Sequence, residues 1–182
     1  MKLTVKEMVL IAFGAALMAV FSQISFPLPF TTVPITLQVF GVVVISVIFE
    51  EKISTVSMII FALLGAIGVP VYSNFSAGAG VLFGATGGYI LGFIFMAYIV
   101  GVAASKNNKL VLFLGTYIGV AIEYVFGVMQ LKLVLNLTFN EALIAGLYPF
   151  IIKDIVVTAL GIMVALIVKK RLKKVVKLGA KA

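Results

Sequence analysis

The chain has 182 residues, of which 63% are hydrophobic and 11% are charged, and its mean hydropathy is +1.28. So few polar residues cannot cover a compact globule of this size in water, and the composition therefore predicts a membrane protein. The chain contains no cysteine and no histidine, which excludes thiolate nucleophiles, imidazole bases and metal sites with Cys or His ligands. Most familiar catalytic chemistry is thereby excluded, and we expect a protein that is not an enzyme.

The formal net charge of +8 raises the question of nucleic-acid binding. A protein of that class spreads its basic residues over one folded face, among polar and aromatic neighbours. Here half of the 14 Lys and Arg residues follow the last hydrophobic run, where membrane proteins keep their cytoplasmic anchors. These seven are Lys169, Lys170, Arg171, Lys173, Lys174, Lys177 and Lys181. We expect no nucleic-acid partner and a lipid bilayer as the surroundings.

Six stretches meet or approach the length of about 20 apolar residues that a helix needs to cross a membrane. A barrel would need strands of about ten residues that alternate apolar and polar positions, and the chain lacks that pattern. We predict an all-α membrane protein with six transmembrane helices in one domain, residues 1–182, which ends in a basic tail, residues 168–182. The predicted spans are residues 8–24, 33–49, 53–69, 81–104, 110–135 and 150–168.

Positive charges predict the orientation, because they collect in short cytoplasmic connections. With the N-terminus inside, the cytoplasmic segments hold 12 of the 14 basic residues, namely the seven of the tail and Lys2, Lys6, Lys52, Lys106 and Lys109. The opposite connections, residues 25–32, 70–80 and 136–148, contain Glu141 as their only formal charge. The pattern predicts that both termini are cytoplasmic. We expect a multi-pass protein of the bacterial cytoplasmic membrane.

Two of the outer connections have an unusual composition. Residues 26–30 and residues 69–80 are apolar and uncharged, yet rich in proline or glycine. Exposed loops are normally more polar, so we expect these connections to pack over a ligand or over helix ends. The alternative is contact with lipid headgroups, a zone that aromatic residues favour.

Ionisable residues inside a membrane are costly and usually mark a substrate path, so Glu123, Lys153 and Asp154 are candidate functional residues. Pro149 suits the first turn of a helix, which places Asp154 near the outer end of the sixth span. There Lys153 and Asn74 can join it around an outward-opening cavity. An internal ion pair or a charge at a helix end is the alternative. The role of Glu123 stays open between a ligand, a lysine of its own helix and a neighbouring hydroxyl.

Small residues recur at helical spacing in the first span. Ala12 and Ala16, with Ala15 and Ala19 one step aside, form small-xxx-small patterns that allow two helices to approach closely. The approach serves either a partner subunit or packing among the six helices. The spacing does not separate these two interpretations.

Three further stretches are distinctive: residues 33–38 (VPITLQ), residues 80–93 (GVLFGATGGYILGF) and residues 149–154 (PFIIKD). Together they resemble the BioY family, the biotin-specific S components of energy-coupling-factor (ECF) transporters. The family's usual form of the third stretch is Pro-Phe-Leu-Pro-Gly-Asp followed by Leu-Leu-Lys. Asp154 matches the acid, whereas Lys153 replaces the glycine and Val157 stands where the family has its lysine.

The resemblance implies an outward-facing biotin pocket and docking onto a transmembrane coupling protein with two ATPase subunits, for which the small-residue face of the first helix supplies the contact. It implies no cofactor, and the chain holds no nucleotide-binding motif. An S component for another vitamin and a membrane-embedded enzyme are the alternatives. The substrate-binding residues that we expect are Asp154 as acceptor of a ureido N–H, Asn74 and Lys153 as donors, Tyr89 and Phe83 as walls, and Gln38.

Overall fold

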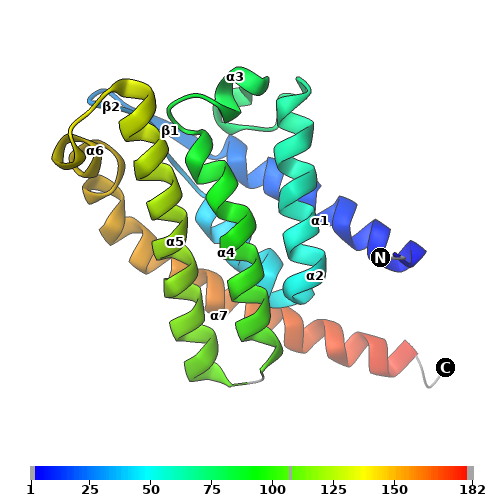
Figure 1. Ribbon diagram of the computed structural model, residues 1–182. Coiled ribbons are helices and arrows are strands. Elements are labelled where there is room, and N and C mark those ends of the chain that lie inside the picture. Colours follow the sequence, from blue (N-terminus) through cyan, green and yellow to red (C-terminus); the bar gives the residue numbers. More distant parts are fainter. Residues whose placement is uncertain (1–2, 107, 180–182) are drawn as a thin grey trace.

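The computed structural model describes residues 3–106 and 108–179, most of which are helical. In Figure 1 the long helices form one bundle, with the two strands, α3 and α6 gathered at one end of it. The elements in chain order are α1 (Val5–Gln23), β1 (Ser25–Leu28), β2 (Thr31–Thr36), α2 (Gln38–Ala66), the 3₁₀ helix η1 (Ser73–Phe75), α3 (Ala79–Leu82), α4 (Gly87–Ser105), α5 (Lys109–Leu135), α6 (Phe139–Gly146) and α7 (Tyr148–Gly179).

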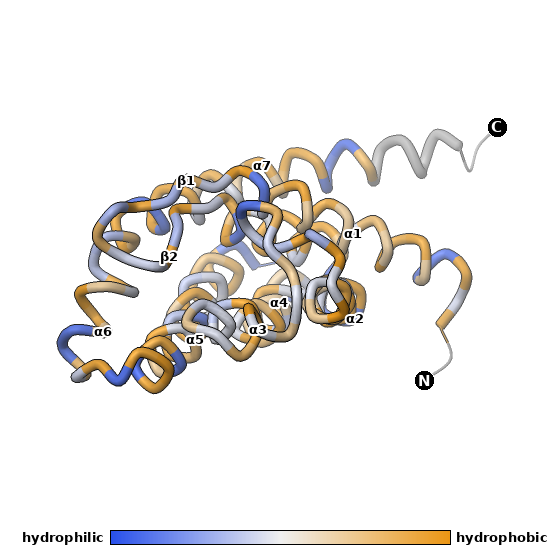
Figure 2. The backbone as a smooth tube through the Cα atoms, turned by 90° about the horizontal axis from the view of Figure 1, so that it is seen from above, coloured by the Kyte–Doolittle hydropathy of each residue, from blue (hydrophilic) through white to orange (hydrophobic). Residues whose placement is uncertain are grey.

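Four helices of the described chain are long and apolar enough to cross a membrane: α1, α4, α5 and the part Tyr148–Leu172 of α7. Hydrophobic residues run along all of these helices in Figure 2, and hydrophilic residues are confined to short segments. The chain is therefore a helical multi-pass membrane protein, as the composition predicts. Most of the second predicted span and most of the third fall on α2, and the total of six crossings stays a prediction.

Helix α2 is broken at one residue, Glu50, whose φ of 62° and ψ of −173° belong to a region that glycine occupies almost alone. Helix α4 passes the break closely, since a Cβ on Gly101 would lie 2.4 Å from Glu51 Cα. Lys169 of α7 pairs with Glu50 at 3.0 Å. The predicted connection between spans two and three is thus a backbone break within α2 instead of a loop.

A β-hairpin occupies the first outer connection and the beginning of the predicted second span. Strands β1 and β2 are antiparallel, with Ser25 opposite Thr36 and an irregular register between Phe26 and Leu28. Pro27 lies at that irregularity because proline has no N–H to donate to the ladder. The predicted helix start at residue 33 is wrong: residues 31–36 are strand, and α2 begins at Gln38.

The predicted fourth span, residues 81–104, is also interrupted. Helix α3 ends at Leu82 and α4 begins at Gly87, because glycines at positions 84, 87 and 88 weaken a continuous helix there. Gln130 of α5 donates hydrogen bonds to the carbonyls of Leu82 (2.8 Å) and Gly84 (2.7 Å), which replace helix partners lost at the break.

Helix α6 lies in a segment that the prediction treats as a connection. A capping box begins it: Thr138 accepts from the Glu141 N–H while the Glu141 carboxylate accepts from the Thr138 N–H. Helix α7 continues to Gly179, past the predicted span end at residue 168. The predictions that rest on Lys2 and Lys181 lie outside the described residues.

Helix α2 is the centre of the bundle, in contact with α1, α4 and α7, while α5 packs against α4. Residues 41–47 of α2 are all buried, so this half of the helix has protein around its whole circumference. The arrangement brings the start of α2, the start of α4, the middle of α5 and the start of α7 to one place below the hairpin.

Candidate ligand-binding site

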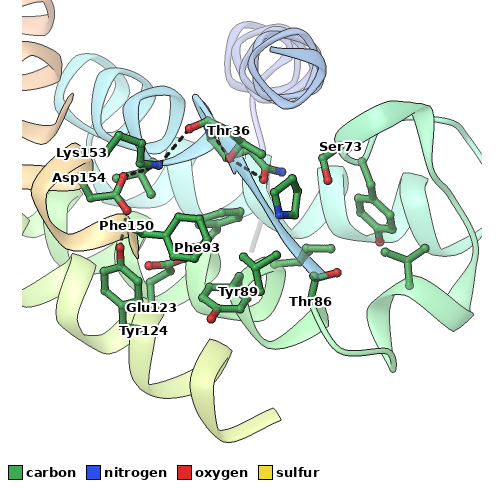
Figure 3. A pocket seen from close by; sticks show the side chains of 17 residues that line it. Thr36, Ser73, Thr86, Tyr89, Phe93, Glu123, Tyr124, Phe150, Lys153 and Asp154 are labelled. Carbon is green, nitrogen blue, oxygen red and sulfur yellow. Dashed lines mark hydrogen bonds and ion pairs between the residues drawn. The ribbon is translucent and has the colours of Figure 1, made fainter. Parts of the chain in front are cut away.

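A pocket lies where these four helices meet the hairpin and the connection between α2 and α3 (Figure 3). Its free volume is about 50 Å³, which holds a few water molecules. The lining combines aromatic rings with a small number of polar groups. It consists of Val33, Pro34, Thr36, Gln38, Val39, Tyr72, Ser73, Val81, Thr86, Tyr89, Ile90, Phe93, Glu123, Tyr124, Phe150, Lys153 and Asp154.

Charge in the pocket is concentrated on Lys153 and Asp154 of α7. The Tyr124 hydroxyl donates to Asp154 Oδ2, and Lys153 Nζ lies 2.7 Å from Asp154 Oδ1. The angles of this contact are not those of a hydrogen bond, so Asp154 Oδ1 can still accept a hydrogen bond from another donor. Lys153 Nζ also donates to the Thr36 carbonyl at 3.2 Å, which ties α7 to the end of β2.

A chain of hydrogen bonds fixes the opposite wall. Thr36 Oγ1 donates to Gln38 Oε1 at 3.1 Å, and Gln38 Nε2 donates to Ser22 Oγ of α1 at 2.9 Å. All three side chains are buried. Gln38 is therefore held at the start of α2, with its amide committed to protein partners.

Aromatic rings form most of the remaining wall. Tyr89 and Tyr124 meet edge to face with centroids 6.4 Å apart, and Phe93 and Phe150 lie beside them. The Tyr89 hydroxyl donates to the Gly146 carbonyl at 2.8 Å, so this residue offers the pocket its ring. The ring fits against α5 only because position 127 is glycine: a Cβ there would lie 2.2 Å from a ring carbon of Tyr89.

The connection between α2 and α3 packs over helix ends, as its composition predicts. Gln23 of α1 donates to the carbonyls of Val71 (3.2 Å) and Tyr72 (3.1 Å), and the Tyr72 ring meets Phe61 edge to face. Burial raises the pKa of the Tyr72 phenol, so its hydroxyl stays a neutral donor to the Ala62 carbonyl. The connection is thereby held over the pocket with Ser73 in the lining.

Four of the six predicted substrate-binding residues lie in the lining: Asp154, Lys153, Tyr89 and Gln38. The structure places the other two outside it, since Asn74 is exposed in η1 and Phe83 is 76% exposed between α3 and α4.

Sequence reasoning missed Tyr124, Phe93, Phe150 and Thr36 as lining residues and left Glu123 without a place. Phe150 precedes Asp154 by four residues and so shares its helix face, a signal that was available in the sequence. Tyr124 and Phe93 are ordinary residues of apolar runs, and the packing of α4 on α5 brings them to the pocket. Thr36 reaches the pocket from the end of β2.

The small residues of α1 divide into two groups. Ala12 and Ala16 are exposed, whereas Ala15 is 3% exposed and belongs to the internal core; Ala19 is partly buried. The outward face of α1 therefore presents Ala12 and Ala16 to its surroundings.

Comparison with known proteins assigns the chain to a family. The family model described as "BioY family" matches residues 1–174. The chain belongs to the BioY family. This confirms the resemblance seen in the three sequence stretches.

Relatives of this BioY-family chain are named as transporters. The probable biotin transporter BioY of Pyrococcus horikoshii is 38% identical over 160 residues, which are 88% of this chain and 94% of the relative. The biotin transporter BioY of Thermotoga maritima is 37% identical over 156 residues, 85% of this chain and 90% of the relative. These names agree with the expectation that the chain is not an enzyme.

A solved structure shares the fold of this BioY-family chain. It is described as the crystal structure of the S-component for biotin from an ECF-type ABC transporter. The two chains superimpose with a TM-score of 0.80 at 26% identity, over 95% of each. The likeness therefore extends over nearly the whole of both chains.

Proposed function

We propose that this chain is the biotin-binding S component of an ECF-type importer, which captures biotin from the outer side of the membrane. The observation that carries the proposal is the pocket in a BioY-family chain, with aromatic walls and the Lys153–Asp154 pair in its lining. The relatives named as biotin transporters and the solved S-component for biotin support the same substrate.

The chemistry of biotin matches this lining. Its fused rings are largely apolar and suit the faces of Tyr89, Phe93 and Phe150. Its ureido head offers two N–H donors and one carbonyl acceptor. In the proposed complex, Asp154 Oδ1 accepts one ureido N–H and Lys153 supplies a donor to the ureido carbonyl.

The pocket must enlarge to admit a vitamin. Its free volume of about 50 Å³ is far below the roughly 300 Å³ at which small-molecule sites begin. The parts that cover it are the hairpin and the connection that contains Ser73, both outside the long helices. We infer that one of these two segments moves when the ligand enters, because loops rearrange on binding more readily than packed helices do.

The proposal includes the topology and the partners. Six membrane crossings, with α2 contributing two, keep both termini in the cytoplasm and the whole chain in one membrane domain of the cytoplasmic membrane. A transmembrane coupling protein docks on the exposed Ala12 and Ala16 of α1, and two ATPase subunits supply the energy for release inward. Small exposed residues on a membrane helix support a close helix contact.

Retention of labelled vitamins by the detergent-purified protein tests the proposed substrate. Labelled biotin, riboflavin and thiamine are each compared with an unrelated membrane protein as the control. We expect saturable retention of biotin that excess riboflavin and thiamine do not displace. Retention of another vitamin in its place reassigns the substrate, and retention of none contradicts the proposal.

A further inference from the structure

Glu123 is a buried carboxyl group that takes no part in the contacts among Tyr124, Lys153 and Asp154. It lies in the middle of α5, is 3% exposed and lines the pocket (Figure 3). Its Oε2 atom is buried and has no hydrogen-bond partner among the described residues. None of the ion pairs within residues 3–106 and 108–179 includes it.

An unpartnered carboxyl in this position is costly. A buried polar group gives up its hydrogen bonds to water, which costs free energy unless a protein or ligand group replaces them. Buried polar groups therefore normally have a hydrogen-bond partner. The other carboxyl of the pocket is already engaged, because Asp154 receives the Tyr124 hydroxyl and faces Lys153. Glu123 is thus the acidic side chain of the pocket with the largest unused capacity to accept a hydrogen bond.

The backbone around Glu123 is fixed, which favours a defined contact. Helix α4 approaches α5 at this point through Gly92, where a Cβ would lie 2.8 Å from Glu123 Cα and 3.2 Å from its Cγ. A side chain on such a support reaches a ligand from a set position.

We propose that Glu123 is a specificity residue of the pocket, whose carboxyl oxygen accepts an N–H of the ligand's head group. The inference rests on the proposed function and extends it: two carboxyls, Asp154 and Glu123, match the two N–H donors of a cyclic urea. A carboxyl keeps an acceptor oxygen whether or not it carries a proton, so the match does not depend on its charge. The ligand class is a cyclic urea with both nitrogens unsubstituted.

Discrimination between closely related ligands follows from this pairing. A ligand that lacks one N–H leaves a carboxyl of the pocket unsatisfied, and sites built on buried polar partners reject such analogues strongly. The predicted loss for each blocked N–H is about 10- to 100-fold in affinity.

The test measures dissociation constants for biotin and for its two analogues methylated on one or the other ureido nitrogen. The wild type, Glu123→Gln, Glu123→Leu and Thr116→Val are compared. Thr116 is a matched control, since it is a fully buried polar residue on α5 outside the pocket lining. Melting temperatures without ligand show whether each variant is folded.

We expect Glu123→Leu to weaken biotin binding about 10- to 100-fold, while Thr116→Val binds as the wild type does. We also expect Glu123→Leu to lose its preference for biotin over one methylated analogue and to keep it over the other. Glu123→Gln keeps a carbonyl acceptor and the shape, so it should retain part of the affinity.

Wild-type protein that binds biotin, together with Glu123 variants of unchanged affinity and unchanged preference, overturns the inference alone. Equal weakening toward biotin and both analogues also overturns it, because that pattern indicates a structural role. Wild-type protein that binds no biotin overturns the proposed function, and the inference with it.

Discussion

At the scale of single residues, Asp154 combines observed contacts within the protein with the proposed contact to biotin. It is 4% exposed, receives the Tyr124 hydroxyl and pairs with Lys153. We predict that Asp154→Asn weakens biotin binding by about 1–3 kcal/mol, one to two decades in affinity, because a charge-assisted hydrogen bond becomes a neutral one. Asp154→Ala should cost at least as much. Equilibrium binding to the purified variants measures both.

Lys153→Met is the control for a purely internal ion pair. Removal of one member of a buried pair strands the other, so this change should lower the melting temperature without ligand. If the Asp154 variants keep full biotin affinity and only melt earlier, as Lys153→Met does, Asp154 is structural and the proposed contact is wrong.

The sequence could predict Lys153 and Asp154 because ionisable residues in an apolar run are rare and conspicuous. It could not predict the partner of Asp154, since Tyr124 lies 30 residues away and meets it only through the packing of α5 near α7. Asn74 is predicted for the cavity because its connection lies on the same side of the membrane as Asp154. The backbone of that connection turns at positive φ, 56° at Asn74, and the pocket receives Ser73 instead.

At the scale of elements, the break in α2 stores strain at Glu50. Its φ of 62° and ψ of −173° cost a non-glycine residue about 1–3 kcal/mol. We predict that Glu50→Gly raises the melting temperature by a few degrees. Glu50→Ala is the matched control, because both changes remove the ion pair with Lys169 and only glycine relieves the backbone. A glycine variant that melts no later than the alanine variant contradicts the assignment of strain.

The two faces of α1 give opposite predictions for the same substitution. Ala12→Trp combined with Ala16→Trp should leave biotin binding near normal and block uptake in cells that also carry the coupling protein and ATPases, because both alanines are exposed. Ala15→Trp should destabilise the protein itself, since Ala15 is 3% exposed and its neighbours cannot make room. Loss of binding in the first variant would indicate that this face serves internal packing.

Hydropathy could predict the long helices but not their interruptions. A window of about 20 residues averages over a one-residue break such as Glu50, over the four residues between α3 and α4, and over a hairpin with apolar strands. The capping box of Thr138 and Glu141 is a sequence signal for the start of α6. A search for membrane spans treats this short helix as part of a connection.

At the scale of the whole molecule, the proposed topology can be tested because the chain contains no cysteine. Single cysteines at Asn140 and Ser105 occupy exposed positions at opposite ends of the bundle. We predict that a membrane-impermeant maleimide applied to intact cells labels Asn140→Cys and labels Ser105→Cys only after permeabilisation. The reverse pattern would invert the orientation, and labelling of both in intact cells would contradict the number of crossings.

The sequence could place Asp154 and Lys153 at a cavity, but it could not predict the rest of the pocket wall, which comes from distant parts of the chain. The pocket is lined by residues of β2, of α4, α5 and α7, and of the connection that follows α2. The distance between α4 and α5 is short because glycines of α4 contact α5. Patterns of charge and hydropathy describe short stretches of the sequence, so they do not predict contacts between distant segments. The resemblance to the family predicts the substrate, whereas the arrangement of the pocket residues follows from the packing of the helices.

The most direct test of the central claim asks whether biotin occupies this pocket. A single cysteine at Ser73, in the lining, and one at Ser105, far from it, are introduced into the cysteine-free chain, and the rate of maleimide labelling is measured with and without saturating biotin. We predict that biotin slows labelling of Ser73→Cys and leaves labelling of Ser105→Cys unchanged. Equal labelling rates at Ser73→Cys in a protein that demonstrably binds biotin would place the vitamin elsewhere and contradict the account.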